Sequence, residues 1–259
     1  MTKMPSLFIG HGSPMNILDR NAYTEALVSL AASLPRPSSI LVVSAHWVSP
    51  GLKLTSGTAP VQIYDFFGFP DELYKVQYAA PGSPGLASRT VGLLKEVGFP
   101  CIEDPVRGID HAAWAILLHM YPEADIPVIE MSLDYHMRPN RWFEVGKAFA
   151  ALRDEGVLVL GSGNIVHNLY RFERDTNAPI YEWAKKFNEA VKKAVADKNW
   201  ETLGSYALPT DDSRDAVPTP DHYLPLLAVL GTMGSDEQAS VFHESFQNAS
   251  IAMTGFRIG

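Results

Sequence analysis

The segment SILVVSAHW, residues Ser39–Trp47, predicts the centre of the fold. Its residues Ile40–Ser44 are all apolar, β-branched or small, and a turn at Pro35–Arg36–Pro37 precedes them. A continuous run of this kind is typical of a strand that is buried on both faces of a sheet. His46 comes immediately after the run, and open α/β sheets bind ligands outside the carboxyl ends of their strands. The segment therefore predicts a histidine placed for chemistry at the end of a central strand.

Two more histidines follow apolar runs in the same way. His11 stands between two glycines after Leu7–Ile9, and His167 lies a few residues beyond Val157–Leu160. His111 and His222 are instead each preceded by an aspartate, at the predicted start of a helix. If the strands are parallel neighbours, their ends and these side chains meet at one edge of the sheet.

Imidazoles gathered at one edge create a physical problem. Protonated rings repel one another, and buried rings without partners leave their nitrogens unsatisfied. A divalent metal ion resolves both difficulties, since neutral imidazole suits zinc, iron, copper and nickel. The order of strands in the sheet does not follow from the sequence, so separate histidines with their own partners stay an open alternative.

Strands and helices alternate along the chain. The predicted strands are Leu7–Ile9, Ile40–Ser44, Leu52–Thr55, Pro100–Glu103, Ile126–Leu133 and Val157–Leu160. The predicted helices are Ala22–Ser33, Ser83–Val97, Gly108–Met120, Pro139–Glu155, Pro179–Lys198 and Pro218–Leu230. Ser240–Phe246 and Ser250–Ile258 alternate like an antiparallel pair. The pattern predicts an α/β fold over residues 1–259, a single three-layer domain whose mixed, mostly parallel sheet has helices on both faces.

Composition limits the function. The 259 residues carry a formal charge of −8 without a basic run, which argues against nucleic-acid binding. The single cysteine, Cys101, cannot form an internal disulfide and points to a reducing compartment. The opening MTKMPSLFIG lacks a signal-peptide pattern, and no apolar run approaches the roughly 20 residues of a membrane span. We therefore expect a cytoplasmic protein that binds no membrane, and leave its oligomeric state open.

The segment Gln62–Pro81 is rich in aromatic residues and irregular. It either packs as a flap on the core or forms a hydrophobic wall for an aromatic substrate.

Two other motifs fail on inspection. VLVLGSGNIV, Val157–Val166, has a valine where a dinucleotide-binding fingerprint needs its third glycine. Neither Ser162 nor Ser13 stands in the G-x-S-x-G pattern of a serine hydrolase. The dinucleotide-binding function is rejected, and the serine hydrolase is a disfavoured alternative.

Five motifs together resemble one family. They are GHGSPMN at Gly10–Asn16, SAHW at Ser44–Trp47, GIDHAAW at Gly108–Trp114, GSGNIVHN at Gly161–Asn168 and PTPDHYLPL at Pro218–Leu226. In this order they resemble the DOPA 4,5-extradiol dioxygenase family, which belongs to the class III ring-cleaving dioxygenases and is related to the protocatechuate 4,5-dioxygenase catalytic subunit.

The resemblance implies a non-haem metal site. It places metal ligands at His11, His46 and His222, with His167 close to the metal as a fourth ligand or as the catalytic acid/base, and His111 facing the substrate as a second catalytic residue. The wider class III group uses two histidines and a glutamate, the facial triad of Fe(II) oxygenases. A third ligand at His222 departs from that pattern. We expect Fe(II) for turnover, with Zn(II) possible in the same site.

Three residues beside these histidines are expected to bind substrate: Trp47, Asp110 and Asn168. The implied activity is cleavage of a DOPA-like catechol by O2 at the bond next to the diol, so that a small aromatic diol and O2 are the reaction partners. A zinc-dependent hydrolase using the same histidines is the alternative function. A metal-binding protein without turnover is a third.

Overall fold

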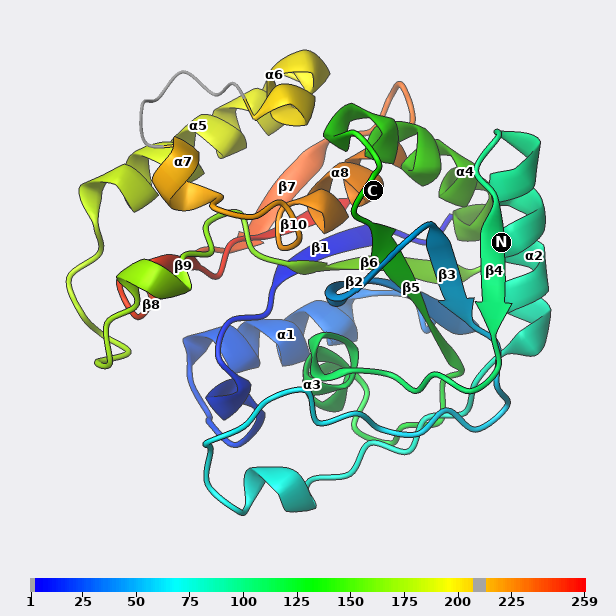
Figure 1. The fold of residues 1–259 in the computed structure, drawn as a ribbon, viewed down its shortest axis with the longest axis horizontal. Helices are drawn as coiled ribbons and strands as arrows, with labels where there is room; N and C mark the ends of the chain where they lie inside the picture. The colour runs from blue at the N-terminus through cyan, green and yellow to red at the C-terminus, as the bar shows by residue number, and fades with distance from the viewer. Residues whose placement is uncertain (1–2, 207–212) are drawn as a thin grey trace.

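A mixed sheet forms the centre of the computed structural model, which describes residues 3–206 and 213–259 (Figure 1). Eight strands lie in the order β4 (Cys101–Asp104), β3 (Leu52–Thr55), β5 (Val128–Asp134), β2 (Ser39–Ser49), β6 (Val157–Gly163), β1 (Ser6–Gly10), β10 (Gly255–Ile258) and β7 (Ala239–His243). A two-stranded sheet pairs β8 (Phe246–Gln247) with β9 (Ile251–Ala252).

The four central strands, β5, β2, β6 and β1, are parallel to one another. At one side β3 runs antiparallel to β5 and parallel to β4. At the other side β10 runs antiparallel to both β1 and β7. The predicted mixed sheet and the predicted antiparallel pairing near the end of the chain are confirmed.

Helices cover both faces of this sheet. On one face lie α1 (Ala22–Ser33) and α3 (His111–Met120), and on the other lie α2 (Pro84–Glu96), α4 (Trp142–Asp154), α5 (Glu182–Ala196) and α8 (Leu224–Gly231) (Figure 1). Each helical layer packs against its own hydrophobic core. The predicted three-layer α/β arrangement is confirmed.

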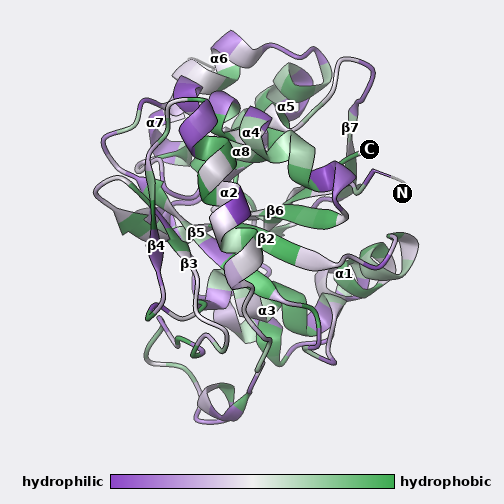
Figure 2. Ribbon diagram, turned by 90° about the vertical axis from the view of Figure 1, so that its right-hand side faces the viewer, coloured by the Kyte–Doolittle hydropathy of each residue, from purple (hydrophilic) through white to green (hydrophobic). Residues whose placement is uncertain are grey.

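Strand β2 shows why the sequence folds this way. Leu41 and Val43 pack into the core beneath α4 and α8, whereas Ile40 and Val42 alternate with them into the core beneath α1 and α3. All four side chains are fully buried, and the central strands are hydrophobic along their length (Figure 2). Burial on both faces is what the continuous apolar run predicted.

Two boundaries near the histidines differ from expectation. Strand β2 continues to Ser49, so His46 lies within the strand and not immediately past it. Its pairing with β5 shifts register between Val43 and Val48, the stretch that contains His46. Helix α8 begins only at Leu224, so His222 lies in the turn before the helix.

Several short elements were not predicted. They are the helices α6 (Trp200–Ser205) and α7 (Ser213–Ala216) and the 3₁₀ turns η1 (Pro14–Ile17), η2 (Leu73–Lys75), η3 (Pro139–Arg141) and η4 (Leu169–Arg171).

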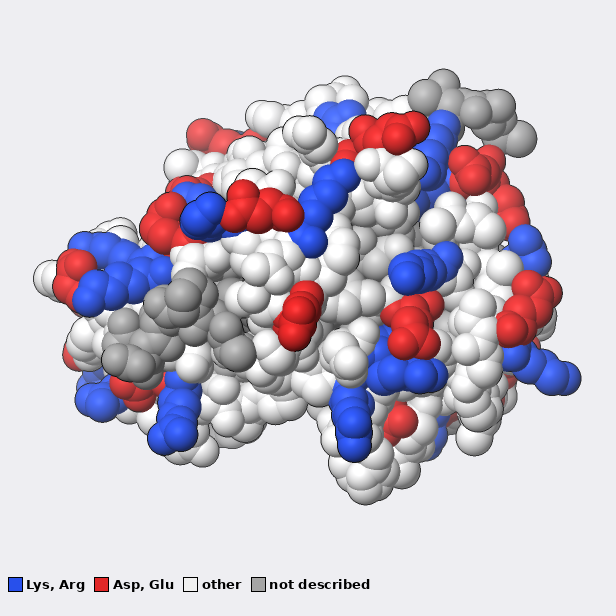
Figure 3. Space-filling view, turned by 90° about the horizontal axis from the view of Figure 1, so that it is seen from above, with Lys and Arg blue, Asp and Glu red and all other residues white. Residues whose placement is uncertain are grey.

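Among the helices that the structure describes, none is both long enough and apolar enough to cross a membrane. The surface seen in Figure 3 carries interleaved positive and negative side chains. Lys192 of α5 contacts both Glu189 and Glu244 at 2.7 Å.

Candidate metal centre

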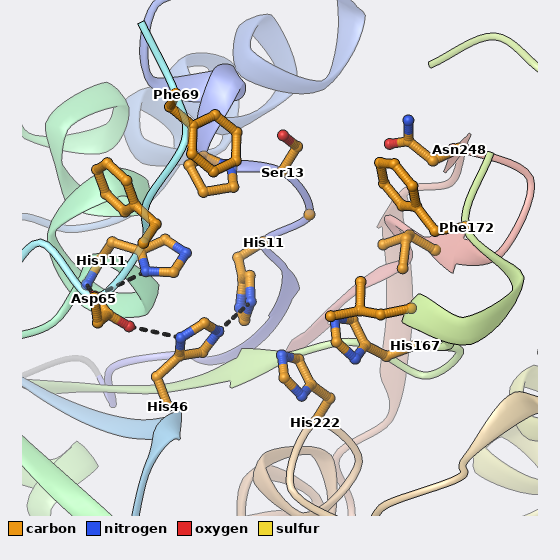
Figure 4. A pocket seen from close by; sticks show the side chains of 15 residues that line it. His11, Ser13, His46, Asp65, Phe69, His111, His167, Phe172, His222 and Asn248 are labelled. Carbon is orange, nitrogen blue, oxygen red and sulfur yellow. Dashed lines mark hydrogen bonds and ion pairs between the residues drawn. The ribbon is translucent and has the colours of Figure 1, made fainter. Parts of the chain in front are cut away.

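Five histidines from distant parts of the chain line one pocket of about 410 Å³ (Figure 4). They come from the end of β1 (His11), from β2 (His46), from the first position of α3 (His111), from the loop after β6 (His167) and from the turn before α8 (His222). Strand β6 pairs with β2 on one side and β1 on the other, so three of these segments leave neighbouring parallel strands. The five predicted histidines therefore do gather at one edge of the sheet.

His11 is positioned by the chain reversal that follows β1. Gly12 has a φ of +62°, a backbone conformation that strongly favours glycine. The Nδ1 atom of His11 lies 2.9 Å from the hydroxyl of Ser162 on β6. Ser162, disfavoured above as a nucleophile, thus orients this ring and leaves its Nε2 facing the pocket.

His46 is oriented by a carboxylate. Its Nδ1 lies 2.7 Å from Oδ2 of Asp65, and its Nε2 lies 3.1 Å from Nε2 of His11 (Figure 4). Burial opposes protonation of His46, but the hydrogen bond and charge of Asp65 outweigh it and raise the pKa of the ring.

The absence of a side chain at Gly163 allows the backbone of His222 to approach β6 closely. A Cβ at Gly163 would lie 2.1 Å from the carbonyl oxygen of His222, which accepts a hydrogen bond from the Asn164 amide at 2.8 Å. The Nδ1 atom of His222 is hydrogen-bonded to Asp221. Its Nε2 is buried and has no hydrogen-bond partner, and burial lowers the pKa of the ring despite that carboxylate.

The facing nitrogens of His11, His46 and His222 form a group that could hold a metal ion. Each ring can offer one ligand atom, and the three atoms lie within 4.8 Å of one another. Burial, followed by the neighbouring histidines, lowers the pKa of His11 well below its usual value. A neutral ring offers a lone pair, which is the form that binds a metal.

His167 lies beside this group without belonging to it. Its ring stacks on that of His222, with centroids 3.5 Å apart and planes 5° from parallel. Burial and the neighbouring His222 lower the pKa of His167 to about 2, so the ring is neutral at pH 7. Within the part of the chain that the structure describes, its side chain has no hydrogen-bond partner.

His111 lies on the opposite side of the pocket. Its ring centroid is 4.3 Å from that of His46, and its Nδ1 is 2.9 Å from Oδ1 of Asp65. Helix α3 is capped at this point by Asp110, whose side chain accepts a hydrogen bond from the amide of Ala112. The predicted helix start at Asp110–His111 is confirmed.

Asp65 is the site residue that the sequence reasoning missed. One carboxylate oxygen faces His46 and the other faces His111 and its backbone amide. Burial opposes its ionisation, but the two histidines hold the pKa of Asp65 below its usual range. The available signal was an acid flanked directly by Tyr64 and Phe66 in a loop rich in aromatic residues.

The aromatic segment Gln62–Pro81 packs on the core and also reaches the pocket, while its role as a wall for an aromatic substrate stays a prediction. Tyr64 and Phe66 contact the buried Trp114 of α3 and so belong to the core. Phe66 also lines the histidine pocket together with Phe69.

The three residues expected to bind substrate are not among the residues that line the pocket. Trp47 is buried beneath the guanidinium of Arg107, 4.5 Å from the ring centroid. Asp110 is fully buried and accepts a hydrogen bond from Ser44 at 2.9 Å. The side chain of Asn168 accepts hydrogen bonds from the amides of Tyr170 and Arg171. A direct role of Trp47, Asp110 or Asn168 in substrate binding stays a prediction.

Comparisons with known proteins agree with this geometry. The family model described as the catalytic LigB subunit of aromatic ring-opening dioxygenase matches residues 5–259. The chain is 43% identical to a 4,5-DOPA dioxygenase extradiol of Escherichia coli (strain K12), over 100% of this chain and 96% of the relative. It is 35% identical to a protein of the same name from Beta vulgaris, over 97% of this chain and 95% of the relative. A crystal structure of an uncharacterized protein from Escherichia coli K12 superposes with a TM-score of 0.86, at 40% identity, over 99% of this chain and 100% of that one.

Proposed function

The chain belongs to the LigB family of aromatic ring-opening dioxygenases and is an extradiol dioxygenase, and we propose that it opens the ring of a DOPA-like catechol at a ferrous ion held by His11, His46 and His222. The observation that carries the proposal is the meeting of these three imidazoles in one pocket. O2 and an aromatic diol are the reactants, and the product is a ring-opened semialdehyde acid.

The residues present fit a metal ion. Two Nε2 atoms only 3.1 Å apart, together with a third buried Nε2 that has no hydrogen-bond partner, form an arrangement that a cation would satisfy. Imidazole in its neutral, metal-binding form suits iron and zinc alike. We expect Fe(II) in the active enzyme and Zn(II) as a competitor for the same site.

Each proposed ligand has an outer partner that fixes its orientation. Hydrogen bonds from Nδ1 to Ser162, Asp65 and Asp221 leave the Nε2 lone pairs of His11, His46 and His222 for the metal. Such outer partners fix the tautomer and raise the basicity of metal-ligating histidines. In this site the carboxylates of Asp65 and Asp221 contact the proposed histidine ligands and not the metal. In the facial triad, by contrast, one carboxylate binds the iron directly.

When bound, a ferrous ion supplies a Lewis acid for the diol and a redox partner for O2. Holding both reactants in one pocket makes their encounter intramolecular, which is worth several kcal/mol.

Two histidines are placed to handle protons and to orient the diol. His167 lines the pocket beside the proposed ligands, and we assign to it the movement of a proton from a catechol hydroxyl. His111 turns Nδ1 toward Asp65, which leaves Nε2 to hydrogen-bond the substrate. A fourth-ligand role for His167 remains the alternative assignment.

The apolar side chains of the pocket restrict water around these groups. Phe66 and Ile251 are buried in its wall, and Phe69 lines it beside them. A low-dielectric wall strengthens the electrostatic interactions of the reacting groups. The expected compartment is the cytoplasm, on the ground of the single free cysteine, Cys101.

An oxygen electrode tests the proposal. Protein loaded anaerobically with Fe(II) and then given air and a catechol should consume O2 and form a coloured semialdehyde. Zinc-loaded protein should do neither. Ester or amide cleavage by the zinc form without O2 uptake would instead support the hydrolase.

A further inference from the structure

A small cavity adjoins the histidine pocket on the side of α1 and α3. It has a volume of about 10 Å³ and shares His11, Gly12, Ser13 and His111 with the lining of the pocket. The rest of its wall comes from η1, α1 and α3, and α3 contacts both of the others. The cavity therefore reaches the histidine group from within the helical layer.

The same cavity also adjoins a hollow on the molecular surface. This hollow has a volume of about 780 Å³, is lined by residues from η1 to α1 and by the end of α3, and shares Ile17 and His119 with the cavity. Ile17 and His119 thus stand at the outer junction, whereas His11 and His111 stand at the inner one. Hollow, cavity and pocket lie in series from the surface to the histidines.

We propose that dioxygen reaches the metal site through this series of spaces, whereas the catechol enters through the opening of the histidine pocket. The inference rests on the proposed function, because it takes the three histidines to hold the metal and the pocket to hold the diol. It goes further by assigning a separate route, with its own residues, to the second reactant.

Size separates the two reactants. The pocket of about 410 Å³ has room for a catechol, and a catechol seated there covers the histidines from the opening. The cavity has room for roughly one water-sized molecule, which excludes an aromatic ring. Dioxygen is a diatomic molecule, and the rotations that side chains undergo on fast timescales are enough to let it pass.

The walls of the cavity suit an apolar, uncharged molecule. Within the described ranges 3–206 and 213–259, no lysine, arginine, aspartate or glutamate lines it. Ile17, Leu27 and Ile116 supply buried aliphatic side chains. An apolar gas moves favourably from water into such surroundings, whereas an ion would lose its hydration there.

Most polar side chains at the cavity already have partners. The amide nitrogen of Asn16 donates to the carbonyl oxygen of His11 and to Gln247, and Nε2 of His119 lies 2.8 Å from the carbonyl oxygen of Asn16. The buried hydroxyl of Tyr23 is the exception, with no hydrogen-bond partner in the described part of the chain. Since a buried water needs about two to four polar partners, these walls favour dioxygen over a resident water.

Dissolved oxygen is itself a probe of this route. Zinc-loaded protein with labelled isoleucine and leucine methyl groups is held under O2 pressure, because paramagnetic O2 speeds the NMR relaxation of the methyl groups that it approaches. The methyl groups of Ile17, Leu27 and Ile116 should gain more relaxation rate than those of Leu152 and Leu227, which are equally buried beneath the other face of the sheet. Equal gains in both groups would overturn the route.

A larger side chain in the cavity should slow dioxygen without weakening catechol binding. Ala115→Leu should lower kcat/KM for O2 about fivefold or more on ferrous protein, while the Kd of DOPA on zinc-loaded protein stays within about twofold of the parent value. Ala32→Leu adds the same side chain at an exposed position of α1 and should leave both quantities unchanged. An unchanged kcat/KM for O2 in folded Ala115→Leu, or equal losses in the two variants, would contradict the route. If Ala115→Leu does not fold, the methyl relaxation of the parent decides.

Tyr23→Phe distinguishes dioxygen from a resident water. The variant keeps the ring and removes the buried hydroxyl, so kcat/KM for O2 should be retained. A loss as large as that expected for Ala115→Leu would assign the cavity to a water held by the hydroxyl and would contradict the route. Faster relaxation at Ile17, Leu27 and Ile116 without O2 uptake by ferrous parent on any catechol would support the gas route while refuting the proposed function.

Discussion

Asp65 Oδ2 lies 2.7 Å from Nδ1 of His46, on the side of the ring away from His11. The other oxygen of the same carboxylate lies 2.9 Å from Nδ1 of His111. One acid therefore joins a proposed metal ligand to a proposed substrate-facing residue. Since Asp65 belongs to the loop that also carries Phe66 and Phe69, it ties the aromatic wall of the pocket to the metal site.

Replacing Asp65 tests whether its carboxylate supports the metal site through His46. Asp65→Asn removes the charge that stabilises the tautomer of His46, so the affinity for Zn(II) should fall about 10- to 100-fold. Calorimetric titration of metal-free protein measures this affinity. The control is Asp71→Asn, at an exposed acid of the same loop, which should bind Zn(II) like the parent. Unchanged affinity in Asp65→Asn would mean that the carboxylate does not support the metal site.

His167→Ala separates proton transfer from metal binding. Loss of an acid/base group should lower kcat about 10²- to 10⁴-fold, while zinc-loaded protein keeps most of its affinity for the catechol. Oxygen consumption and calorimetry measure the two quantities. Cleavage of catechols at the parent rate by this variant would contradict the acid/base role of His167. Loss of the metal together with the activity would instead identify His167 as a metal ligand.

Gly163→Ala tests how β6 admits His222. The added methyl would lie 2.1 Å from the carbonyl oxygen of His222, so the turn that carries this ligand must move. We expect weaker metal binding and a lower Tm. Gly92→Ala is the matched control, because a Cβ at this position of helix α2 would meet nothing within 4 Å. This substitution should stabilise the protein by about 0.5–1 kcal/mol. Normal metal affinity in Gly163→Ala would show that the turn can shift and still position His222, and would contradict the need for glycine at this position.

A buried ion pair far from the pocket predicts how stability depends on pH. The guanidinium of Arg153 is fully buried and lies 2.6 Å from a carboxylate oxygen of Glu237. Burial opposes ionisation of Glu237, but this contact lowers its pKa from 4.5 to about 2. Because the folded state has the lower pKa, the stabilisation is complete above pH 4.5 and is lost as the pH falls toward 2.

Glu237→Gln should therefore lower the free energy of unfolding by about 2 kcal/mol at pH 7, an amount reduced from the full shift because the carboxylate is partly exposed. Urea unfolding at several pH values should show the gap between variant and parent closing as the pH falls below 4.5. Glu155→Gln breaks the exposed pair with Arg89 and should change stability by less than about 0.5 kcal/mol. A gap for Glu237→Gln that stays constant with pH would contradict the assignment.

The sequence predicted the parts of this molecule that have strong local patterns. The apolar runs at Ile40–Ser44 and Val157–Leu160 became central strands, and Asp110 capped a helix that begins at His111. Glycines beside His11 and before His167 indicated the turns at the site.

Features that depend on distant contacts could not be predicted in this way. The partnership of Asp65 with His46 and His111 exists only after the loop folds over the strand ends. The burial of Trp47 beneath Arg107 likewise depends on a neighbouring segment. The extension of β2 through His46 reflects pairing with β5, which the sequence of β2 does not contain.

The central claim is that three imidazoles hold one metal ion, and anomalous diffraction from crystals of zinc-loaded protein tests it most directly. We predict one ion per chain, about 2.0–2.1 Å from Nε2 of each of His11, His46 and His222. An ion held instead by His46, Asp65 and His111, or a chain that binds none, would contradict the account.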